Sequence, residues 1–368
     1  MSSRPSVGFA ANGLLQTHRI TSKAIRAHAA RSAEIDDYAD SEIEADGPGF
    51  ALAVVARGTV VHAAGYGLAD LRRGLPVEAD TIFHLASCGK QFTGLGVLML
   101  AEEGKLHLDD AVGKHLPSIA GFGPRVTIRQ LLHHTSGIRD LYDEDGVKQV
   151  LARCERPANA DVIRTYADLG CPMAEAGTKA GDTYSYSNSG YELLGAVIEG
   201  VSGQSYHDFF ARRVFDRLEM KDTFSVPDRR IDDPRCATGY TLDDWDDFIE
   251  AGGNEFDGLV GSGSFYTTAF DLCRYEQALR TNSLISETSM AQAFTGGRTN
   301  DGDSTNYGFG WSLGVQNGIS FADHEGDWNG FRSYICYCLD PALSIFVLSN
   351  HPELDLSEAA DVAIDAYR

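Results

Sequence analysis

The sequence has no long apolar run. No stretch of its 368 residues approaches the ~18 consecutive apolar residues that a membrane-spanning helix needs. The first residues, Met1 to Leu15, include Arg4 but no continuous apolar core, so they are not typical of a secretory signal peptide. We therefore expect a cytoplasmic protein that does not act at a membrane.

Cysteine is present, but not in a pattern typical of a disulfide framework or a metal site. The seven cysteines are an odd, scattered set without a C-x-x-C pair. Cys336 and Cys338 lie two residues apart on a predicted strand and therefore face one side of it. His133 and His134 are adjacent, but no second ligand pair with zinc spacing accompanies them. We expect reduced, mostly buried thiols, no bound metal and no cofactor.

Positive charge is scarce. Lysine and arginine number 31 against 53 aspartates and glutamates, which gives a formal net charge of −22. This balance repels phosphate backbones and anionic lipid, so it argues against a nucleic-acid-binding or membrane-surface protein. With 43% hydrophobic residues, the chain can bury a substantial core. We expect a small-molecule or peptide substrate as the partner, and the composition leaves the oligomeric state open.

The N-terminal part of the chain, which shows no internal repeat, has patterns typical of both helices and strands. An alanine- and charge-rich segment at 22–43 predicts a helix, and two apolar runs around a tight turn at 57–58 predict a β-hairpin. A short predicted strand at 81–85 then runs into Ser87. An apolar helix follows over 90–103 and is closed by a glycine.

Helical patterns fill the middle of the chain, and strands return at its C-terminal end. The predicted C-terminal elements are strands at 307–313, 319–324, 331–338 and 343–349 and a helix at 357–367. Strands at both ends predict one sheet built from both termini, with the helical region inserted into it. The fold class is therefore α+β, with a sheet subdomain of residues 1–112 and 255–368 and a mainly helical subdomain of residues 113–254.

The first candidate for chemistry is Ser87-Cys88-Gly89-Lys90, between the short strand and the apolar helix. Three residues apart on a helix, Ser87 and Lys90 share a face and can touch. A serine hydroxyl needs a base beside it to act as a nucleophile, and burial at a positive helix N-terminus makes a lysine able to serve. The same N-terminus offers the Ser87 backbone N–H to a developing oxyanion. An S-x-x-K pattern arises by chance about once in a chain of this length, so it does not establish a function alone.

Two further segments carry candidate groups. Tyr186 and Asn188 lie two apart in a predicted extended segment, so the phenol can exchange a proton with Ser87 while the amide binds a substrate. His324 ends an apolar strand just before Gly326, a glycine of the kind that lets a ligand approach the backbone. His324 can then donate to the reacting centre or to Tyr186. Taken alone, these segments are better explained as a polar loop and a surface histidine.

Together, the three segments resemble the three motifs of the penicillin-recognising serine hydrolases in order and approximate spacing. The resemblance is to the class C β-lactamase branch, with its esterase, D-aminopeptidase and DD-carboxypeptidase relatives. It continues between the motifs at 83–110, at 126–137, which ends in Thr-Ser-Gly, and at 346–350. It covers about residues 48–365, nearly the whole chain.

This resemblance implies an antiparallel sheet covered by helices on both faces, with the active site in the cleft between the sheet and an all-helical subdomain. The implied catalytic residues are Ser87, Lys90, Tyr186 and His324, the last standing where many relatives carry lysine. Ser87 would attack a carbonyl to form an acyl-enzyme, and Lys90 and Tyr186 would share general-base duty in an order that stays open. The backbone N–H groups of Ser87 and Asp327 would form the oxyanion hole, and Asn188 would position the substrate.

The third motif departs from the family pattern. The lactamase form is Lys-Thr-Gly, whose cation and hydroxyl hold a substrate carboxylate, whereas this chain has His-Glu-Gly-Asp at 324–327. Glu325 and Asp327 share a face of the strand, and their charges would repel a bound carboxylate unless a group such as Arg332 neutralised one of them. We therefore expect a neutral or amine-bearing ester or amide as the substrate. The residues expected to contact it are Asn188, Glu325, Gly326 and Asp327.

Three alternatives stay open: a β-lactamase or DD-peptidase, an acyltransferase that uses the same acyl-enzyme, and a non-catalytic binding protein on the same fold. A β-lactamase needs the anion-binding site that the third motif lacks. An acyltransferase differs only in the acceptor, which pocket shape and water exclusion choose. A non-catalytic protein predicts a broken motif, whereas Ser87, Lys90, Tyr186 and His324 are all present.

Overall fold

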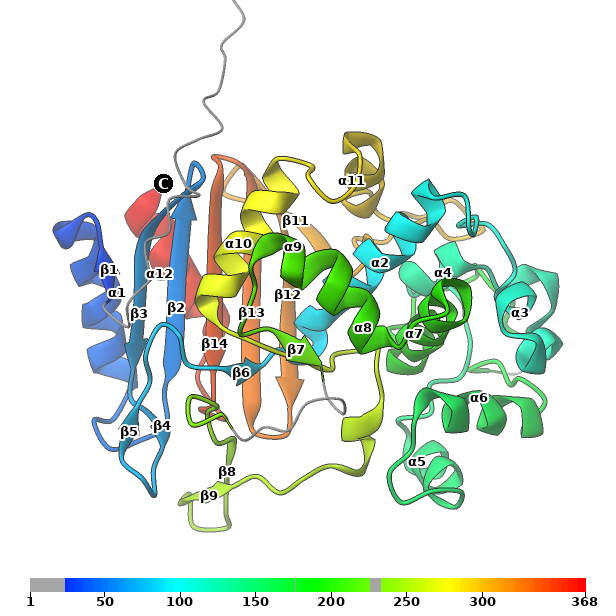
Figure 1. The fold of residues 1–368 in the computed structure, drawn as a ribbon, viewed down its shortest axis with the longest axis horizontal. Helices are drawn as coiled ribbons and strands as arrows, with labels where there is room; N and C mark the ends of the chain where they lie inside the picture. Colours follow the sequence, from blue (N-terminus) through cyan, green and yellow to red (C-terminus); the bar gives the residue numbers. More distant parts are fainter. Residues whose placement is uncertain (1–23, 176, 226–232) are drawn as a thin grey trace, which may run out of the picture.

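The centre of the molecule is a seven-stranded sheet with the strand order β1-β3-β2-β14-β13-β12-β11 (Figure 1). A computed structural model describes residues 24–175, 177–225 and 233–368, and every neighbouring pair of this sheet is antiparallel. The strands are β1 (Ile25–Arg26), β2 (Phe50–Ala56), β3 (Thr59–Tyr66), β11 (Ser312–Gln316), β12 (Ile319–Trp328), β13 (Phe331–Asp340) and β14 (Leu343–Ser349). Because β2 pairs with β14, the N-terminal and C-terminal parts of the chain form one sheet, as the sequence predicted.

Helices cover both faces of this sheet because successive side chains of its central strands enter different cores. On β2, Leu52 belongs to the core beneath α1 (Ala29–Glu42) and α12 (Leu356–Tyr367), which pack against each other. Its neighbour Ala53 belongs to the core on the opposite face, which α10 (Ala269–Arg280) covers. Figure 1 shows α10 in front of the sheet and α12 behind it. The predicted α+β fold with both faces covered is confirmed.

The helices of the middle of the chain lie beside the sheet, to the right in Figure 1. They are α3 (Val112–His115), the 3₁₀ segment η2 (Pro117–Arg125), α4 (Ile128–Leu132), α5 (Glu144–Leu151), α6 (Asn159–Asp168), α7 (Asn188–Ser202) and α8 (Tyr206–Phe210). The π-helical turn η3 (Ala211–Phe215) and α9 (Asp216–Leu218) continue from α8, and α9 lies in front of the sheet beside α10 (Figure 1). α7 packs against α2 (Lys90–Glu102), the helix that follows the predicted nucleophile. Within the described ranges, no helix combines the length and apolar character needed to cross a membrane.

The remaining elements are short strands, turns and one helix. They are the hairpins β4–β5 (Leu68–Asp70, Leu75–Pro76) and β8–β9 (Tyr240–Leu242, Phe248–Glu250), the three-stranded sheet of β6 (Phe83–His84), β10 (Phe265–Thr267) and β7 (Phe224–Ser225), the 3₁₀ turns η1 (Ala86–Gly89) and η4 (Glu255–Gly258), and α11 (Glu287–Ala293). The boundaries near residues 112 and 255 stay predictions. β7, which precedes the second boundary, pairs with β10, which follows it.

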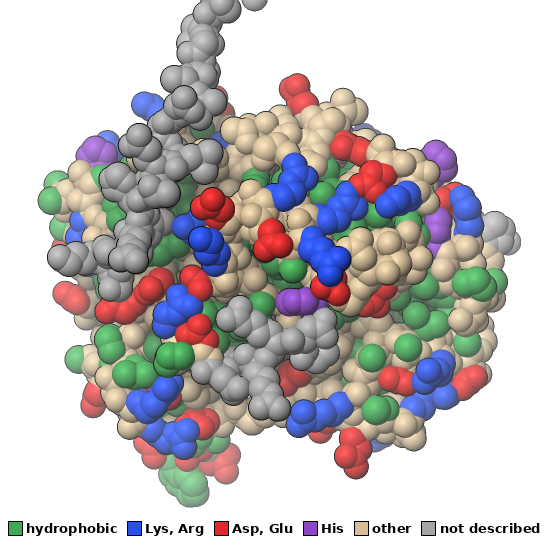
Figure 2. Space-filling view, viewed as in Figure 1, with side chains coloured by type: hydrophobic (Ala, Val, Ile, Leu, Met, Phe, Trp, Pro, Cys, Tyr) green, Lys and Arg blue, Asp and Glu red, His purple; other side chains and the backbone are tan. Residues whose placement is uncertain are grey.

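The face of the molecule drawn in Figure 2 mixes acidic and basic side chains. Red and blue groups alternate over it, and neither sign gathers into one large patch. This face therefore shows no single acidic region, although the chain as a whole has a formal net charge of −22.

Three predicted elements differ from the structure. The strand predicted over 319–324 continues past His324 to Trp328, so His324 does not end it. The helix predicted over 22–43 is preceded by β1 and begins only at Ala29, and its first two residues lie outside the described ranges. The strand predicted over 307–313 is largely irregular, and β11 begins only near its end. The reason lies at Gly310, which has a φ of +83° and approaches α2 so closely that a Cβ would lie 2.5 Å from the Lys90 carbonyl oxygen.

Candidate active site

Ser87 lies in the 3₁₀ turn η1, between the strand β6 and the helix α2. The preceding residue, Ala86, has a φ of +47°, in the left-handed region that a non-glycine residue rarely adopts. Gly263 makes room for this turn, because a Cβ there would lie 2.4 Å from the Ala86 carbonyl oxygen. The chain thus bends sharply at Ser87 and holds it at the N-terminus of α2, the strand-to-helix position that the sequence predicted.

Lys90, the first residue of α2, is fully buried. Its Nζ lies 3.0 Å from Ser87 Oγ, 2.8 Å from Asn188 Oδ1 and 2.7 Å from the Ser262 carbonyl oxygen. Burial lowers the pKa of Lys90 to about 7, although the carboxyl group of Glu192 acts in the opposite direction. At neutral pH, a large share of this amine is therefore unprotonated.

Tyr186 and Asn188 reach Lys90 from the start of α7. Ser187 is the N-cap of this helix, so Asn188 is its first residue and does not belong to the extended segment that we predicted. Tyr186 still contacts the same lysine, whose Nζ lies 4.8 Å from the centre of the phenol ring. Burial raises the pKa of Tyr186, and hydrogen bonding with Ser87 only partly opposes this shift. The phenol therefore keeps its proton at neutral pH.

Behind Tyr186 lies His134, a buried residue that we predicted only as part of a helix end. Its Nδ1 accepts a hydrogen bond from the Ser187 backbone N–H (3.1 Å). The centre of its ring lies 4.3 Å from that of Tyr186 and 4.6 Å from that of Tyr307. Burial holds the pKa of His134 well below its usual range, so the ring is neutral and supports the phenol. Its only signal in the sequence is its place beside Thr135-Ser-Gly.

His324, on β12, is buried and neutral. Its Nε2 accepts a hydrogen bond from the Tyr307 hydroxyl (2.9 Å), and its Nδ1 donates to the Glu325 carbonyl oxygen. Burial, with a smaller effect from Lys90, lowers the pKa of His324 to about 3, so this ring does not supply the cation that a lysine would. Its centre lies 6.1 Å from that of the Tyr186 ring. Both ring nitrogens are therefore engaged elsewhere, and His324 holds Tyr307 in place. It does not donate the hydrogen bond to Tyr186 that we considered.

β12 passes close to the turn η1, which holds Ser87, because residue 326 is glycine. A Cβ at Gly326 would lie 2.4 Å from Ser333 Oγ and 3.0 Å from the Cβ of Ala86. β11 pairs only with the first half of β12, so Asp327 has no strand on that side within the described residues. Asp327 and Ser87 line the same two cavities, as the predicted oxyanion hole requires.

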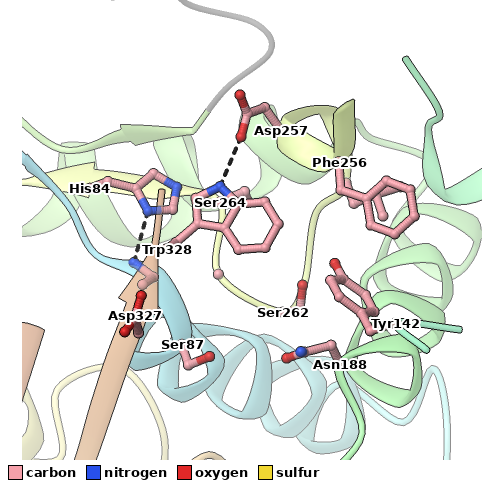
Figure 3. A pocket seen from close by; sticks show the side chains of 13 residues that line it. His84, Ser87, Tyr142, Asn188, Phe256, Asp257, Ser262, Ser264, Asp327 and Trp328 are labelled. Atoms are coloured by element: carbon pink, nitrogen blue, oxygen red, sulfur yellow. Dashed lines mark hydrogen bonds between the residues drawn. The ribbon is translucent and has the colours of Figure 1, made fainter. Parts of the chain in front are cut away.

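The smaller of these cavities, of about 410 Å³ when the space open to solvent is included, has aromatic walls (Figure 3). Tyr142, Phe256 and Trp328 form them, and Trp328 Nε1 donates to Asp257 Oδ1 (2.8 Å). The other polar side chains that line it are His84, Ser87, Asn188, Ser262, Ser264 and Asp327. We predicted none of the three aromatic residues, because they come from separate segments and belong to none of the motifs.

The larger cavity, of about 1160 Å³ when the space open to solvent is included, is lined mainly by acids among its charged residues, and we call it the acidic groove. The carboxyl groups that line it are Asp323, Glu325, Asp327 and Asp355. Burial raises the pKa of Asp323 to about 6, and this group accepts a hydrogen bond from Tyr334. Arg332 also lines this groove and stands opposite Asp327 in the ladder, and its guanidinium donates to the Leu354 carbonyl oxygen (2.7 Å). We considered an ion pair between Arg332 and an acid of β12, but the ion pairs of the described residues do not include one.

Other metal-binding or reactive side chains do not join the site. In the part of the chain that the structure describes, no group of three or more histidine, cysteine, aspartate or glutamate side chains is placed to hold a metal ion. Cys88 is buried, and its thiol donates to the His324 carbonyl oxygen (3.0 Å), which is the packing role that we predicted. Cys336 and Cys338 share a face of β13, with their sulfur atoms 3.9 Å apart.

Comparison with known proteins decides the family. The model of the family described as Beta-lactamase matches residues 25–367. The chain belongs to the Beta-lactamase family. It is 32% identical to Penicillin-binding protein 4* of Bacillus subtilis (strain 168), over 80% of this chain and 66% of that protein. It is 30% identical to Protein flp of Staphylococcus aureus (strain MW2), over 82% of this chain and 59% of that protein.

A solved structure shows the same fold. The octameric penicillin-binding protein homologue from Pyrococcus abyssi matches with a TM-score of 0.79 and 26% identity, over 90% of this chain and 76% of that one. The family of serine hydrolases and the fold that the three motifs predicted are thus confirmed. The chain spans only 59 to 66% of the length of the two curated relatives.

Proposed function

We propose that this chain is a hydrolase that forms an acyl-enzyme on Ser87 and acts on neutral or amine-bearing esters or amides. The arrangement around Lys90 carries the proposal. A neutral amine has two N–H donors and one lone pair. The oxygens of Asn188 and Ser262 can only accept, so they take the two donors. The lone pair is then left for the Ser87 hydroxyl, 3.0 Å away, which orients Lys90 as the base.

The reaction would run in two stages. The Ser87 oxygen attacks the carbonyl carbon of the substrate while its proton passes to Lys90 Nζ, directly or through the Tyr186 hydroxyl. The backbone N–H groups of Ser87 and Asp327 receive the negative oxygen that develops. The proton then moves to the leaving oxygen or nitrogen as the C–O or C–N bond breaks. A water oxygen then attacks the acyl carbon while one of its protons passes to the same base. The bond between the acyl carbon and Ser87 Oγ breaks, the base returns the proton to Ser87, and the acid is released.

The acidic groove supports a substrate without a carboxylate beside the scissile bond. Glu325 and Asp327 are exposed on one face of β12 and share a cavity with Ser87. Two like charges about 4 Å apart repel by about 1 kcal/mol in water and by about 4 kcal/mol near a protein surface. A substrate carboxylate in the groove would meet this repulsion, whereas a substrate ammonium would be attracted by a similar amount.

β-Lactam or DD-peptide hydrolysis is the second candidate, because the relative at 32% identity is named Penicillin-binding protein 4*. The third motif favours the first candidate. At the positions where β-lactamases carry a lysine and a hydroxyl, this chain has His324, which burial keeps neutral, and the carboxylate of Glu325.

A substrate panel tests the choice. Wild type and Ser87→Ala would be assayed with p-nitrophenyl esters, D-amino acid amides and nitrocefin. We expect turnover of the esters or amides that is lost in Ser87→Ala, with nitrocefin hydrolysed far more slowly. Comparable turnover of nitrocefin and a simple ester would favour the second candidate. Product analysis with an added alcohol or amine would reveal acyl transfer.

A further inference from the structure

A buried glutamate lies behind the wall of the smaller cavity. Glu192, one turn after Asn188 on α7, is only 1% exposed. Its Oε1 accepts hydrogen bonds from the Tyr142 hydroxyl (2.6 Å) and from Ser262 Oγ (3.4 Å). Its Oε2 has no hydrogen-bond partner among the described residues. The proposed reaction does not use this side chain, yet both of its hydrogen-bond donors line the cavity.

Ser262 connects Glu192 with Lys90. Its carbonyl oxygen accepts from Lys90 Nζ (2.7 Å), while its hydroxyl donates to the carboxyl group of Glu192. Both end groups are buried, so each charge acts on the other through a medium of low polarity. Burial raises the pKa of Glu192 to about 8. After burial itself, Glu192 is the largest influence on the pKa of Lys90, and it favours the ammonium form.

Other titratable groups surround the pair. They are Cys88, His134, Asp140, Tyr142, Tyr186, Tyr191 and His324. Burial lowers the pKa of both histidines and raises the pKa of the thiol and of the three phenols, so these groups are neutral near pH 7. Asp140 is the other acid, and it already accepts hydrogen bonds from the hydroxyl and backbone N–H of Ser189 at the start of α7. Asp140 also favours the ammonium form of Lys90, but by less than Glu192 does.

We propose that Glu192 is a positioning residue that sets the protonation state of Lys90. The inference rests on the proposed function of Ser87. With the Glu192 carboxyl protonated, no negative charge from it stabilises the ammonium, and Lys90 gives up its proton to become the base. When the pair holds one proton and Glu192 is ionised, that proton stays on Lys90, and Ser87 is not activated until a higher pH removes it. The pair titrates as one unit, and only the form with a neutral amine takes the Ser87 proton.

Glu192→Gln tests this assignment because it keeps the size and polarity of the side chain but cannot ionise. The acidic limb of the pH profile of kcat/KM for a neutral ester reports the pKa of the catalytic base in the free enzyme. We expect this limb to move to lower pH by about one unit, because the pair can then no longer keep its last proton on Lys90 with Glu192 ionised. An unmoved limb, or one that moves to higher pH, would overturn the proposal. A merely structural role would lower kcat/KM equally at every pH.

Glu276→Gln is the matched control. Glu276 is also 1% exposed, and burial raises its pKa, but it lies on α10 and pairs with Arg280, outside both cavities. We expect its acidic limb to coincide with that of the wild type. A shift in Glu276→Gln as large as in Glu192→Gln would overturn the assignment, because it would then report only the loss of a buried acid.

A second measurement serves if Glu192→Gln does not fold. Infrared spectra of Glu276→Gln with ¹³C-labelled glutamate carboxyl groups should show one protonated carboxyl at about pH 6.5 that is lost by about pH 9. A spectrum without such a band at the lower pH would overturn the proposal. Labelling of Ser87 by a fluorophosphonate distinguishes a failure of the role of Glu192 from a failure of the proposed function. If Ser87 is labelled but the limb does not move, only the role of Glu192 fails; if Ser87 is not labelled, the proposed function fails.

Discussion

The smaller cavity and the acidic groove both open onto Ser87, but they offer a substrate opposite surroundings. The smaller cavity has aromatic walls, and its one acid apart from Asp327 at the shared rim is Asp257, which accepts from the indole of Trp328. The groove presents Glu325 and Asp327, neither of which takes part in the ion pairs found within the described ranges.

This difference indicates how a substrate would lie across Ser87. Burying an apolar group against aromatic side chains is favourable by about 25 cal/mol per Å² of surface removed from water. An ammonium gains instead from the unpaired carboxylates of the groove. We therefore expect the apolar part of a substrate in the smaller cavity and an amine, where there is one, in the groove.

The largest effect is expected when the base next to Ser87 is removed, because both cavities open onto Ser87. Lys90→Met should lower kcat/KM for every ester by about 10³-fold or more, because the base next to Ser87 is lost. Amine-bearing and neutral esters should lose the same factor. A loss that differed between them would mean that Lys90 contributes to the charge of one cavity rather than to the reaction. A thermal unfolding scan confirms that the variant is folded.

The next effect concerns the groove alone. Changing Glu325→Gln and Asp327→Asn together should lower kcat/KM for an amine-bearing ester by about 10- to 100-fold, because two attractive charges are removed. A neutral ester of the same size should change by less than about twofold, and high salt should weaken the preference for the amine in the wild type. Glu287→Gln, an exposed acid at the start of α11, is the matched control. Equal losses for both esters would contradict the assignment of the groove.

The smallest effect concerns the aromatic walls. Trp328→Ala should raise KM for esters with a large apolar group by about 5- to 10-fold, because part of the apolar surface is then left in water. Acetyl esters, which are too small to reach the wall, should change little. Trp245→Ala provides the control, since this tryptophan is 80% exposed beside the β8–β9 hairpin. An unchanged preference for large esters in Trp328→Ala would place the apolar group elsewhere.

The same comparison explains what the sequence could predict about the site. The acids of the groove come mainly from one strand, where alternation alone places Glu325 and Asp327 on a shared face. Ser87 and Lys90 lie within one turn, so their contact follows from local geometry. Both features are local in the chain, and the sequence predicted both.

The smaller cavity is assembled differently. Tyr142, Phe256 and Trp328 are separated by about a hundred residues or by several strands and meet only through packing. Glu192 likewise looks like an ordinary polar position on α7, and only its burial beside Ser262 makes it chemically significant. No spacing rule predicts such encounters.

The fold shows the same division. The hairpin of β2 and β3 and the strands β12 to β14 follow from apolar alternation and turn residues, which are properties of short segments. The strand predicted over 307–313 was placed too early in the chain. Gly310 approaches the backbone of Lys90, and the sequence does not reveal this contact between distant segments. Asn188 was placed in an extended segment because the capping role of Ser187 was not recognised.

The central claim is that Ser87 is a nucleophile activated by a neutral Lys90. The most direct measurement is the rate at which a fluorophosphonate labels Ser87 as a function of pH, with the adduct mapped by mass spectrometry. Burial lowers the pKa of Lys90 to about 7, so the active unprotonated form is lost below that pH. The rate should fall about tenfold per pH unit below about pH 7 and level off above it. No adduct on Ser87 in the folded protein, or a rate that does not change between pH 5 and 8, would contradict the account.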